Sequence, residues 1–308
     1  EIKPIIEVYF FIALRTRHDK EPRVDNQRYR LVLLAENETG YKNLIKLVTE
    51  SNLTGFYYKP RIDHELLERH AEGLIAILPS FSSESSVALK QDNLERAEQV
   101  ILDHKHWFGN NQVFLELTHH PEISGHEELM QKVKTLAKTT DTPLVAAHDV
   151  YYLKPEDRLA RETLMRIQGS FGGGFNDEED NFSFVSQTTA VELFKDEPEA
   201  LANTLKIAER CNLEIEFKWT FPDFIIASGR GPDEELQITA YEGVAWRGLS
   251  LEDPEVKKRL DYELDVIKMK GYAVYFLAVG DLLREARERG ILTTIRGSVA
   301  GSLTTYVL

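Results

Sequence analysis

Residues 31–48 read LVLLAENETGYKNLIKLV, an apolar run followed by a helical pattern. The run at 31–35 is continuously apolar, which is typical of a strand covered on both faces of a parallel sheet. The pattern behind it predicts a helix over residues 41–50. A strand followed by a helix is the repeating unit of α/β folds, so this stretch predicts the fold class.

The same alternation recurs over the first two thirds of the chain. Further strands are predicted at residues 4–13, 74–78, 113–117 and 144–147, and further helices at residues 93–102, 127–137 and 198–210. Repeated strand–helix units predict a parallel sheet, open or closed into a barrel, with ligands at the carboxyl ends of its strands. The stretch GSFGGGFNDEED (169–180) breaks the alternation, and its three consecutive glycines predict a mobile loop.

A second region is predicted after about residue 215. Residues 217–234, FKWTFPDFIIASGRGPDE, lack periodicity and indicate the crossing between the two regions. Within them, Gly229-Arg230-Gly231 predicts a plain turn, because Pro232 and two acidic residues follow and no helix dipole faces an anion. One amphipathic helix is then marked by Val256, Leu260, Leu264 and Ile267, and a second helix over residues 272–289 is closed by Gly290.

Composition limits the class of protein. The 308 residues are enough for two ordinary domains, and the net charge of −14 argues against a surface that binds nucleic acid over its whole extent, although it allows one local basic site. The single cysteine, Cys211, leaves no internal disulfide framework and favours a reducing cytoplasm. Because no apolar run approaches about 20 residues, no membrane span is expected, and the predicted location is cytoplasmic.

The stretch TTIRGSVAGSLTTYVL (293–308) carries two Gly-Ser pairs. Gly297-Ser298 and Gly301-Ser302 follow Arg296 and precede an apolar run. Glycine lets a backbone approach a ligand closely, and serine adds a hydroxyl to exposed N–H groups, a combination that suits phosphate oxygens at the start of a helix. For a lone Gly-Ser pair, a tight turn between helices is the alternative.

Five stretches together resemble the C-family bacterial replicative polymerases, the alpha subunits of DNA polymerase III. They are LVLLAENETGYKNLIKLV (31–48), GFYYKPRID (55–63), PLVAAHDVYYLKPED (143–157), GYAVYFLAVGDLLREARERGI (271–291) and RGSVAGSLTTYVL (296–308). They run in the order of the family and span nearly the whole chain.

The resemblance implies two domains. Residues 1–215 would be a PHP domain, a distorted β/α barrel that lacks its N-terminal strands, and residues 216–308 would be the beginning of a nucleotidyltransferase palm. The chain is then similar to an internal fragment, with the catalytic Asp-x-Asp pair, which holds Mg²⁺, after Leu308. The implied partners are primer–template DNA, deoxynucleoside triphosphates, the sliding clamp and other replicase subunits.

The resemblance also raises the question of a metal site in the PHP region. Tyr9, Arg30 and Tyr151 stand at positions where family members with an intact site carry Glu or His ligands. His119, His120, His148 and Asp149 remain at strand ends and could form a partial site, yet no bound metal is expected, because an ion needs several convergent ligands. Arg30 is hypothesised to replace the ion as a structural cation by pairing with nearby carboxylates such as Asp149. Five other histidines are expected to be solvated: His64, His70, His104, His106 and His126.

The function expected from this resemblance is DNA-directed DNA polymerisation by the parent protein, with the fragment inactive alone. The residues expected to bind the triphosphate are Arg296, Gly297, Ser298, Gly301 and Ser302. Two alternatives stay open: a metal-dependent phosphoesterase or proofreading nuclease centred on the barrel, and a non-catalytic scaffold. The aromatic run at 56–58 is expected to pack against the barrel loops rather than to stack on bases.

Overall fold

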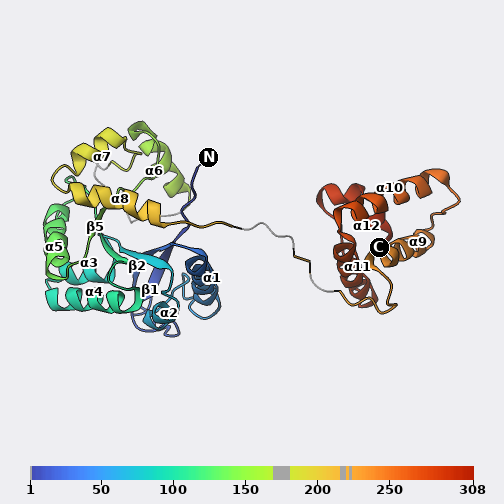
Figure 1. Cartoon of the computed structure of the whole chain (residues 1–308), viewed down its shortest axis with the longest axis horizontal. Helices are drawn as coiled ribbons and strands as arrows, with labels where there is room; N and C mark the ends of the chain where they lie inside the picture. The colour runs from blue at the N-terminus through green and yellow to red at the C-terminus, as the bar shows by residue number, and fades with distance from the viewer. Residues whose placement is uncertain (1, 169–180, 216–219, 222–223) are drawn as a thin grey trace. The chain divides into compact units, whose positions relative to one another are not determined.

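The computed structural model describes residues 2–168, 181–215, 220–221 and 224–308. The chain divides into two compact units, Glu1–Ile215 and Glu216–Leu308 (Figure 1). The loop predicted at residues 169–180 lies outside the described residues. No helix in the described ranges is both long and apolar enough to cross a membrane.

The first unit is built on a five-stranded sheet in the order β1-β2-β3-β4-β5. The strands are β1 (Glu7–Ala13), β2 (Arg28–Ala35), β3 (Leu74–Leu78), β4 (Val113–Leu117) and β5 (Leu144–Ala146). The α/β class expected from the sequence is confirmed, and the described strands form an open sheet rather than a closed barrel.

The expectation of a wholly parallel sheet is wrong for its first half. β2 pairs antiparallel with both β1 and β3, whereas β3, β4 and β5 are parallel to one another. No helix interrupts residues 14–27, so the chain turns back directly from β1 into β2. After β2, two helices run out and return, and the N–H of Glu36 donates to the carbonyl of Gly73 at 3.0 Å. The chain therefore enters β3 at the same end of the sheet at which it left β2.

Eight α-helices of the first unit lie within the described residues. They are α1 (Glu38–Leu53), α2 (His64–Arg69), α3 (Glu84–Lys90), α4 (Leu94–Phe108), α5 (His126–Thr139), α6 (Arg158–Ile167), α7 (Gln187–Leu193) and α8 (Pro198–Arg210). Helix α1 begins where the side chain of Asn37 accepts the N–H of Gly40, an N-cap that satisfies one free donor of the first turn.

Both faces of the sheet are covered, which explains the continuously apolar strands. Neighbouring residues of β2 enter different cores: Leu33 packs with α1, α2, α4 and α5, while Leu34 packs with Ile207 and Cys211 at the end of α8. Figure 1 shows α8 running beside β5, in agreement with the contacts between them. Because both pleat faces are covered, most positions of the strands are apolar, with Glu7, Arg28, Arg30 and Glu116 among the exceptions.

A buried arginine fastens the loops next to β1. The Arg61 guanidinium is fully buried and donates to four backbone carbonyls, those of Gly55, Asp25, Arg17 and Asp19, at 2.9–3.1 Å. It also lies over the Tyr57 ring, 5.2 Å from the centroid. Of the aromatic run, Phe56 and Tyr58 stay more than half exposed, so the run is only partly a packing cluster.

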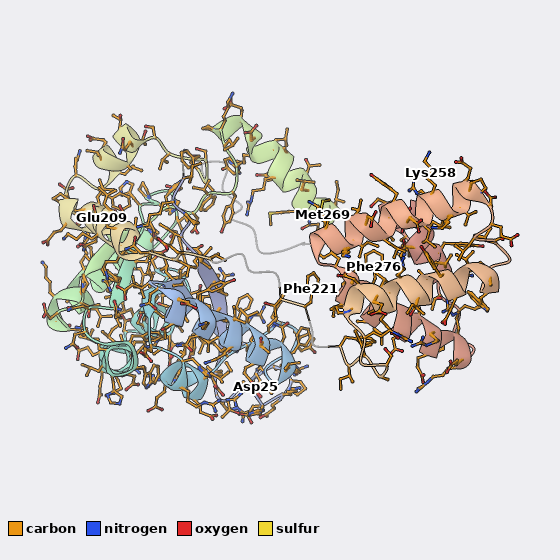
Figure 2. The ribbon with its side chains drawn as sticks, turned by 45° about the vertical axis from the view of Figure 1, so that its right-hand side comes forward. Asp25, Glu209, Phe221, Lys258, Met269 and Phe276 are labelled. Carbon is orange, nitrogen blue, oxygen red and sulfur yellow. The ribbon has the colours of Figure 1, made fainter. Side chains whose placement is uncertain are left out.

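The second unit consists of helices in its described residues. They are α9 (Pro232–Trp246), α10 (Pro254–Lys270), α11 (Ala273–Glu288) and α12 (Leu303–Val307), with a 3₁₀ turn at Gly297–Gly301. The expected apolar stripe is confirmed, since Leu260, Leu264 and Ile267 of α10 enter the core. Figure 2 shows Lys258 and Met269 near the two ends of α10, and both residues are exposed.

Helix α12 is short and is held from several sides. Gly243 of α9 lies so close that a Cβ atom there would stand 2.0 Å from the carbonyl oxygen of Val307. At its C-terminal end, Arg247 donates to the carbonyl of Tyr306 and Arg287 to that of Leu308, each at 2.7 Å. Cationic side chains on the last carbonyls of a helix satisfy groups that lack a partner within the helix.

Candidate functional site

Three histidines gather where the parallel strands end. His120 follows β4 and is 1% exposed, and its ring stacks on His148, which follows β5, at a centroid distance of 5.2 Å. His126, at the start of α5, meets His120 edge to face at 5.6 Å. We call His120, His126 and His148 the histidine cluster. His119, predicted with them, is exposed, so the structure brings together only part of the predicted group.

Each member of the histidine cluster donates one hydrogen bond. His120 Nδ1 donates to Glu122 at 2.9 Å, His148 Nε2 donates to the carbonyl of Ser183 at 3.0 Å, and His126 Nε2 donates to the carbonyl of Thr118 at 3.3 Å. His120 Nε2 and His126 Nδ1 are buried without a partner in the described part of the chain. Burial lowers the pKa of His126 and of His148, which favours neutral rings.

Glu116 is a carboxylate with a shifted pKa at the end of β4, and the sequence analysis did not identify it as a candidate. It is the one polar residue in the strand VFLEL, and its carboxylate accepts the N–H of Ser80 at 2.7 Å. The pKa of Glu116 is raised to about 7, mainly by burial; the hydrogen bond from Ser80 opposes this rise, and the negative charge of Asp149 contributes to it. A charged residue inside an apolar strand was the available signal, because such a residue is seldom buried without a reason.

Of the three positions at which the resemblance implied metal ligands, two hold residues that contact each other, Tyr9 and Arg30. Arg30 donates to the Tyr9 hydroxyl at 3.3 Å and lies over that ring, 5.4 Å from its centroid. Burial raises the pKa of Tyr151, with Asp149, Arg161, Arg30 and Tyr9 as its charged or polar neighbours. Arg30 forms no ion pair with Asp149 or any other described carboxylate, so the hypothesis that it pairs with Asp149 is wrong.

The described residues do not offer a fitting donor set for a metal ion. No group of three or more His, Cys, Asp or Glu side chains within them is arranged to hold one. In the histidine cluster, one ring nitrogen of each histidine is already bonded, to Glu122 or to a backbone carbonyl. We therefore derive no chemical step through a metal ion at this place.

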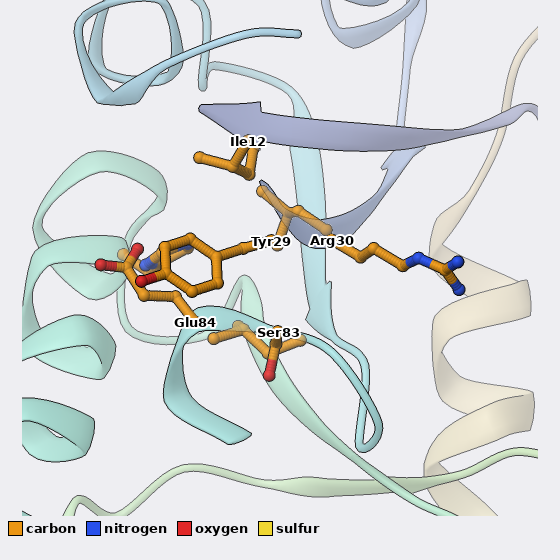
Figure 3. A pocket seen from close by; sticks show the side chains of 8 residues that line it. Ile12, Tyr29, Arg30, Ser83 and Glu84 are labelled. Atoms are coloured by element: carbon orange, nitrogen blue, oxygen red, sulfur yellow. The ribbon is translucent and has the colours of Figure 1, made fainter. Parts of the chain in front are cut away.

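A small cavity of about 10 Å³ lies beside α3 and α4, and its polar lining was also missed (Figure 3). Glu84, 8% exposed, accepts from His64 Nε2 at 2.9 Å and pairs with Arg96. Figure 3 shows Tyr29 directed toward Glu84 and Arg30 directed away, because successive residues of a strand point to opposite faces of the sheet. Although burial opposes it, the His64 bond and the nearby cations lower the pKa of Glu84, which holds the carboxylate ionised.

Two histidines expected to be solvated are buried instead. His104, which lines the same cavity, is 4% exposed and so is His126. His104 Nδ1 donates to the carbonyl of Val100 at 2.8 Å, and burial lowers the pKa of His104 to about 4. Both rings lie on the inner faces of amphipathic helices, where one local hydrogen bond makes a neutral imidazole tolerable.

The Gly-Ser loop of the second unit, Arg296–Ser302, has a different character. Residues 296–301 are all exposed, and Gly297 has the left-handed backbone angle φ 71°. Among the described residues, the side chains of Arg296 and Ser298 form no hydrogen bond or ion pair. This half of the loop therefore presents a permanent positive charge, a hydroxyl and exposed backbone to solvent.

The other half of the loop is occupied. The sequence argument that free donors stand at the start of the following helix is wrong, because the carboxylate of Glu263 on α10 accepts from them. Its partners are the Ser302 hydroxyl at 2.9 Å and the backbone N–H groups of Leu303 at 3.1 Å and Thr304 at 2.8 Å. Sequence reasoning missed Glu263, although its place three residues after Leu260 put it on the buried face of α10.

The Gly229-Arg230-Gly231 stretch is a turn, as expected, but it leads directly into a helix. The prediction that no helix follows is wrong: α9 begins at Pro232 with Gly231 as its N-cap. Proline at the first helical position and the acidic residues 233–235 are helix-start signals. Arg230 pairs with Glu235 of that first turn at 3.2 Å. The acidic residues of the turn thus already offset the positive charge of Arg230 and of the helix start.

Comparison with known families agrees with this geometry. Residues 1–120 match the family model described as the PHP domain, so the first unit is of the PHP class. Residues 234–308 match the model described as the bacterial DNA polymerase III alpha NTPase domain, and this range contains the Gly-Ser loop. The chain is homologous to bacterial DNA polymerase III alpha subunits.

The sequence similarity to curated proteins extends over the entire chain. It is 36% identical to the DNA polymerase III subunit alpha of Borreliella burgdorferi and 33% identical to that of Treponema pallidum, and each match covers 100% of this chain. The corresponding subunit of Aquifex aeolicus is 32% identical over 100% of this chain. The chain spans only 27–28% of the length of these curated relatives.

Proposed function

We propose that this chain is part of a DNA-directed DNA polymerase and that its Gly-Ser loop binds the triphosphate of the incoming deoxynucleoside triphosphate. The observation that supports this most is the uncommitted side of the loop. Arg296 and Ser298 are exposed and make no bond to the described residues, while the family match covers the same segment. A guanidinium with exposed N–H groups in a glycine-containing turn is well suited to phosphate oxygens.

The proposed site comprises Arg296, Gly297, Ser298, Gly301 and Ser302. Arg296 supplies a charge that does not titrate in the physiological range, and the glycines allow close approach of the backbone to the ligand. Polymerases stabilise the charge that develops in nucleotidyl transfer with divalent ions. We place the carboxylates that hold Mg²⁺ outside this chain, and so expect the chain alone to be inactive. Primer–template DNA, the sliding clamp and other replicase subunits are the proposed partners, and the cytoplasm is the proposed location.

The first unit is proposed to act as a scaffold within that polymerase. Tyr9, Arg30 and Tyr151 fill three former ligand positions of the PHP site, and Arg30 contacts the Tyr9 ring and hydroxyl. A phosphoesterase would need convergent ligands that activate water. Elemental analysis that found a stoichiometric metal in the purified protein, together with phosphodiester cleavage, would reverse this assignment.

The nucleotide proposal is tested by steady-state primer extension with the polymerase that contains this segment. Arg296→Ala should lower kcat/KM for the nucleotide at least about tenfold, since a charge-assisted bond is worth roughly 1.5–3 kcal/mol, while primer–template affinity changes little. Arg289→Ala is the control, because this exposed arginine of the same unit pairs with Glu285 on the helix surface and with no other carboxylate in the described ranges. Loss of DNA binding with normal nucleotide kinetics would contradict the proposal.

A further inference from the structure

The two halves of the Gly-Ser loop are in unequal states. Glu263 is 8% exposed, and its carboxylate receives three hydrogen bonds from Ser302, Leu303 and Thr304. Arg259, one turn earlier on α10, donates to the same carboxylate at 2.6 Å. The Ser302 hydroxyl also accepts the N–H of Thr305 at 3.1 Å, so its single O–H donor and one of its two acceptor lone pairs are used.

This arrangement places an anion of the protein where a phosphate would otherwise bind. Carboxylate and phosphate compete for the same donors at a helix start. A triphosphate could reach the N–H groups of Leu303 and Thr304 only by displacing Glu263 from a nearly buried position and from Arg259. Next to Glu263, a second negative charge would also be repelled.

No residue that the structure describes occupies the first half of the loop in this way. Arg296, Gly297 and Ser298 are exposed, and a Cβ atom added at Gly297 would meet nothing within 4 Å. The connection between the halves is short, because the N–H of Ser302 donates to the carbonyl of Val299 at 3.0 Å. Fixing the position of Ser302 therefore also restricts the 3₁₀ turn Gly297–Gly301, which connects Ser302 to Arg296.

We propose that Glu263 is a positioning residue that anchors the Ser302 half of the loop to α10, so that only the Arg296–Ser298 half contacts the triphosphate. The inference rests on the proposed nucleotide-binding function and deepens it, because it divides the five predicted residues by role. Ser298 is a phosphate ligand, whereas Ser302 is a link between the loop and Glu263. Glu263 does not touch the nucleotide and acts only through the loop.

The test compares four variants in the polymerase that contains this segment. Glu263→Gln removes the charge and directs an amide group at donors, so it should raise KM for the nucleotide roughly tenfold while kcat changes less than about threefold. Ser302→Ala should do the same more weakly and keeps the test open if Glu263→Gln fails to fold. Ser298→Ala should lower kcat/KM without changing the thermal midpoint. Asp261→Asn is the matched control, because this carboxylate of α10 bonds Tyr241 and Lys257 on another face.

The outcomes separate the two proposals. If Arg296→Ala impairs nucleotide use but Glu263→Gln leaves KM unchanged or lowers it, the positioning role is wrong and the nucleotide role stands. An equal rise of KM in Asp261→Asn and Glu263→Gln would also reject the positioning role, since general loosening of α10 would then explain both. If neither Arg296→Ala nor Ser298→Ala affects the nucleotide, the proposed function itself fails.

Discussion

The histidine cluster of the first unit and the Gly-Ser loop of the second hold similar polar chemistry in opposite conditions. In the cluster, each ring donates to a fixed protein acceptor, and the pKa of two of the three rings is lowered by burial. In the loop, Arg296 and Ser298 remain solvated and uncommitted within the described residues. Polar side chains that are hydrogen-bonded within the protein contribute to its stability. Solvated polar side chains next to an anchored backbone are available to bind a ligand. The difference gives a direct criterion for ranking candidate sites.

The largest expected effect comes from removing a buried polar group of the first unit. Arg61→Ala would leave four backbone carbonyls without their donor, so we expect a loss of about 4 kcal/mol in the free energy of unfolding. Chemical denaturation followed by circular dichroism measures it. Arg69→Ala, at an exposed surface arginine 3.8 Å from Glu65, should cost less than about 0.5 kcal/mol. Comparable small losses in both variants would break the comparison.

A pH dependence should follow from His104. Its folded-state pKa, about 4, lies below its ordinary value of 6.5, so between those values the unfolded chain takes up a proton that the folded ring does not. The stability it contributes is present above pH 6.5 and is lost as the pH falls toward 4. The native protein should therefore lose up to about 3 kcal/mol more over this range than His104→Gln. In His106→Gln, at an exposed neighbour on the same helix, the native slope should persist; a flat native profile would count against a buried neutral His104.

The smallest effect is expected at Arg30. Its exposed contact with Tyr9 consists of one 3.3 Å hydrogen bond and a cation–π approach, and it has no ion-pair partner among the described residues. Arg30→Ala should change the free energy of unfolding by about 0.5 kcal/mol or less. A loss above about 2 kcal/mol in thermal or chemical unfolding would mean that Arg30 does replace a structural ion, and would sharpen the ranking of former ligand positions.

The parts of the fold that could be predicted are those written in periodicity. The strand positions, the helix at 198–210 and the apolar stripe of α10 follow from local burial patterns, and the structure has all of them. Strand direction could not be predicted, because a strand buried on both faces has the same composition in a parallel and in an antiparallel pair. The reversal of β2 depends on whether the connections cross the sheet, which is a property of the whole chain.

The candidate sites show the same limit at the level of single residues. Arg296 and the Gly-Ser pairs could be found because their types and spacing are local. For Glu263 and Glu116 the sequence pattern indicated a position on a buried face, but the groups that each carboxylate bonds, such as Ser302 for Glu263, could not be predicted from the pattern. The start of α9 is an error of another kind: its proline and acidic first turn were local signals, interpreted as a turn alone.

The structure of the Gly-Ser loop depends on helix α12, and α12 in turn depends on the helices around it. A helix of five residues is far below the length at which helices persist in water, so its order comes from Gly243, Arg247, Arg287 and Glu263 around it. The loop in front of it is consequently not a portable element. We expect a synthetic peptide of residues 296–308, or the same segment grafted onto another scaffold, to keep the sequence of the motif but not its folded conformation. Any transplant, antigen or inhibitor screen aimed at this loop has to carry α9, α10 and α11 along with it.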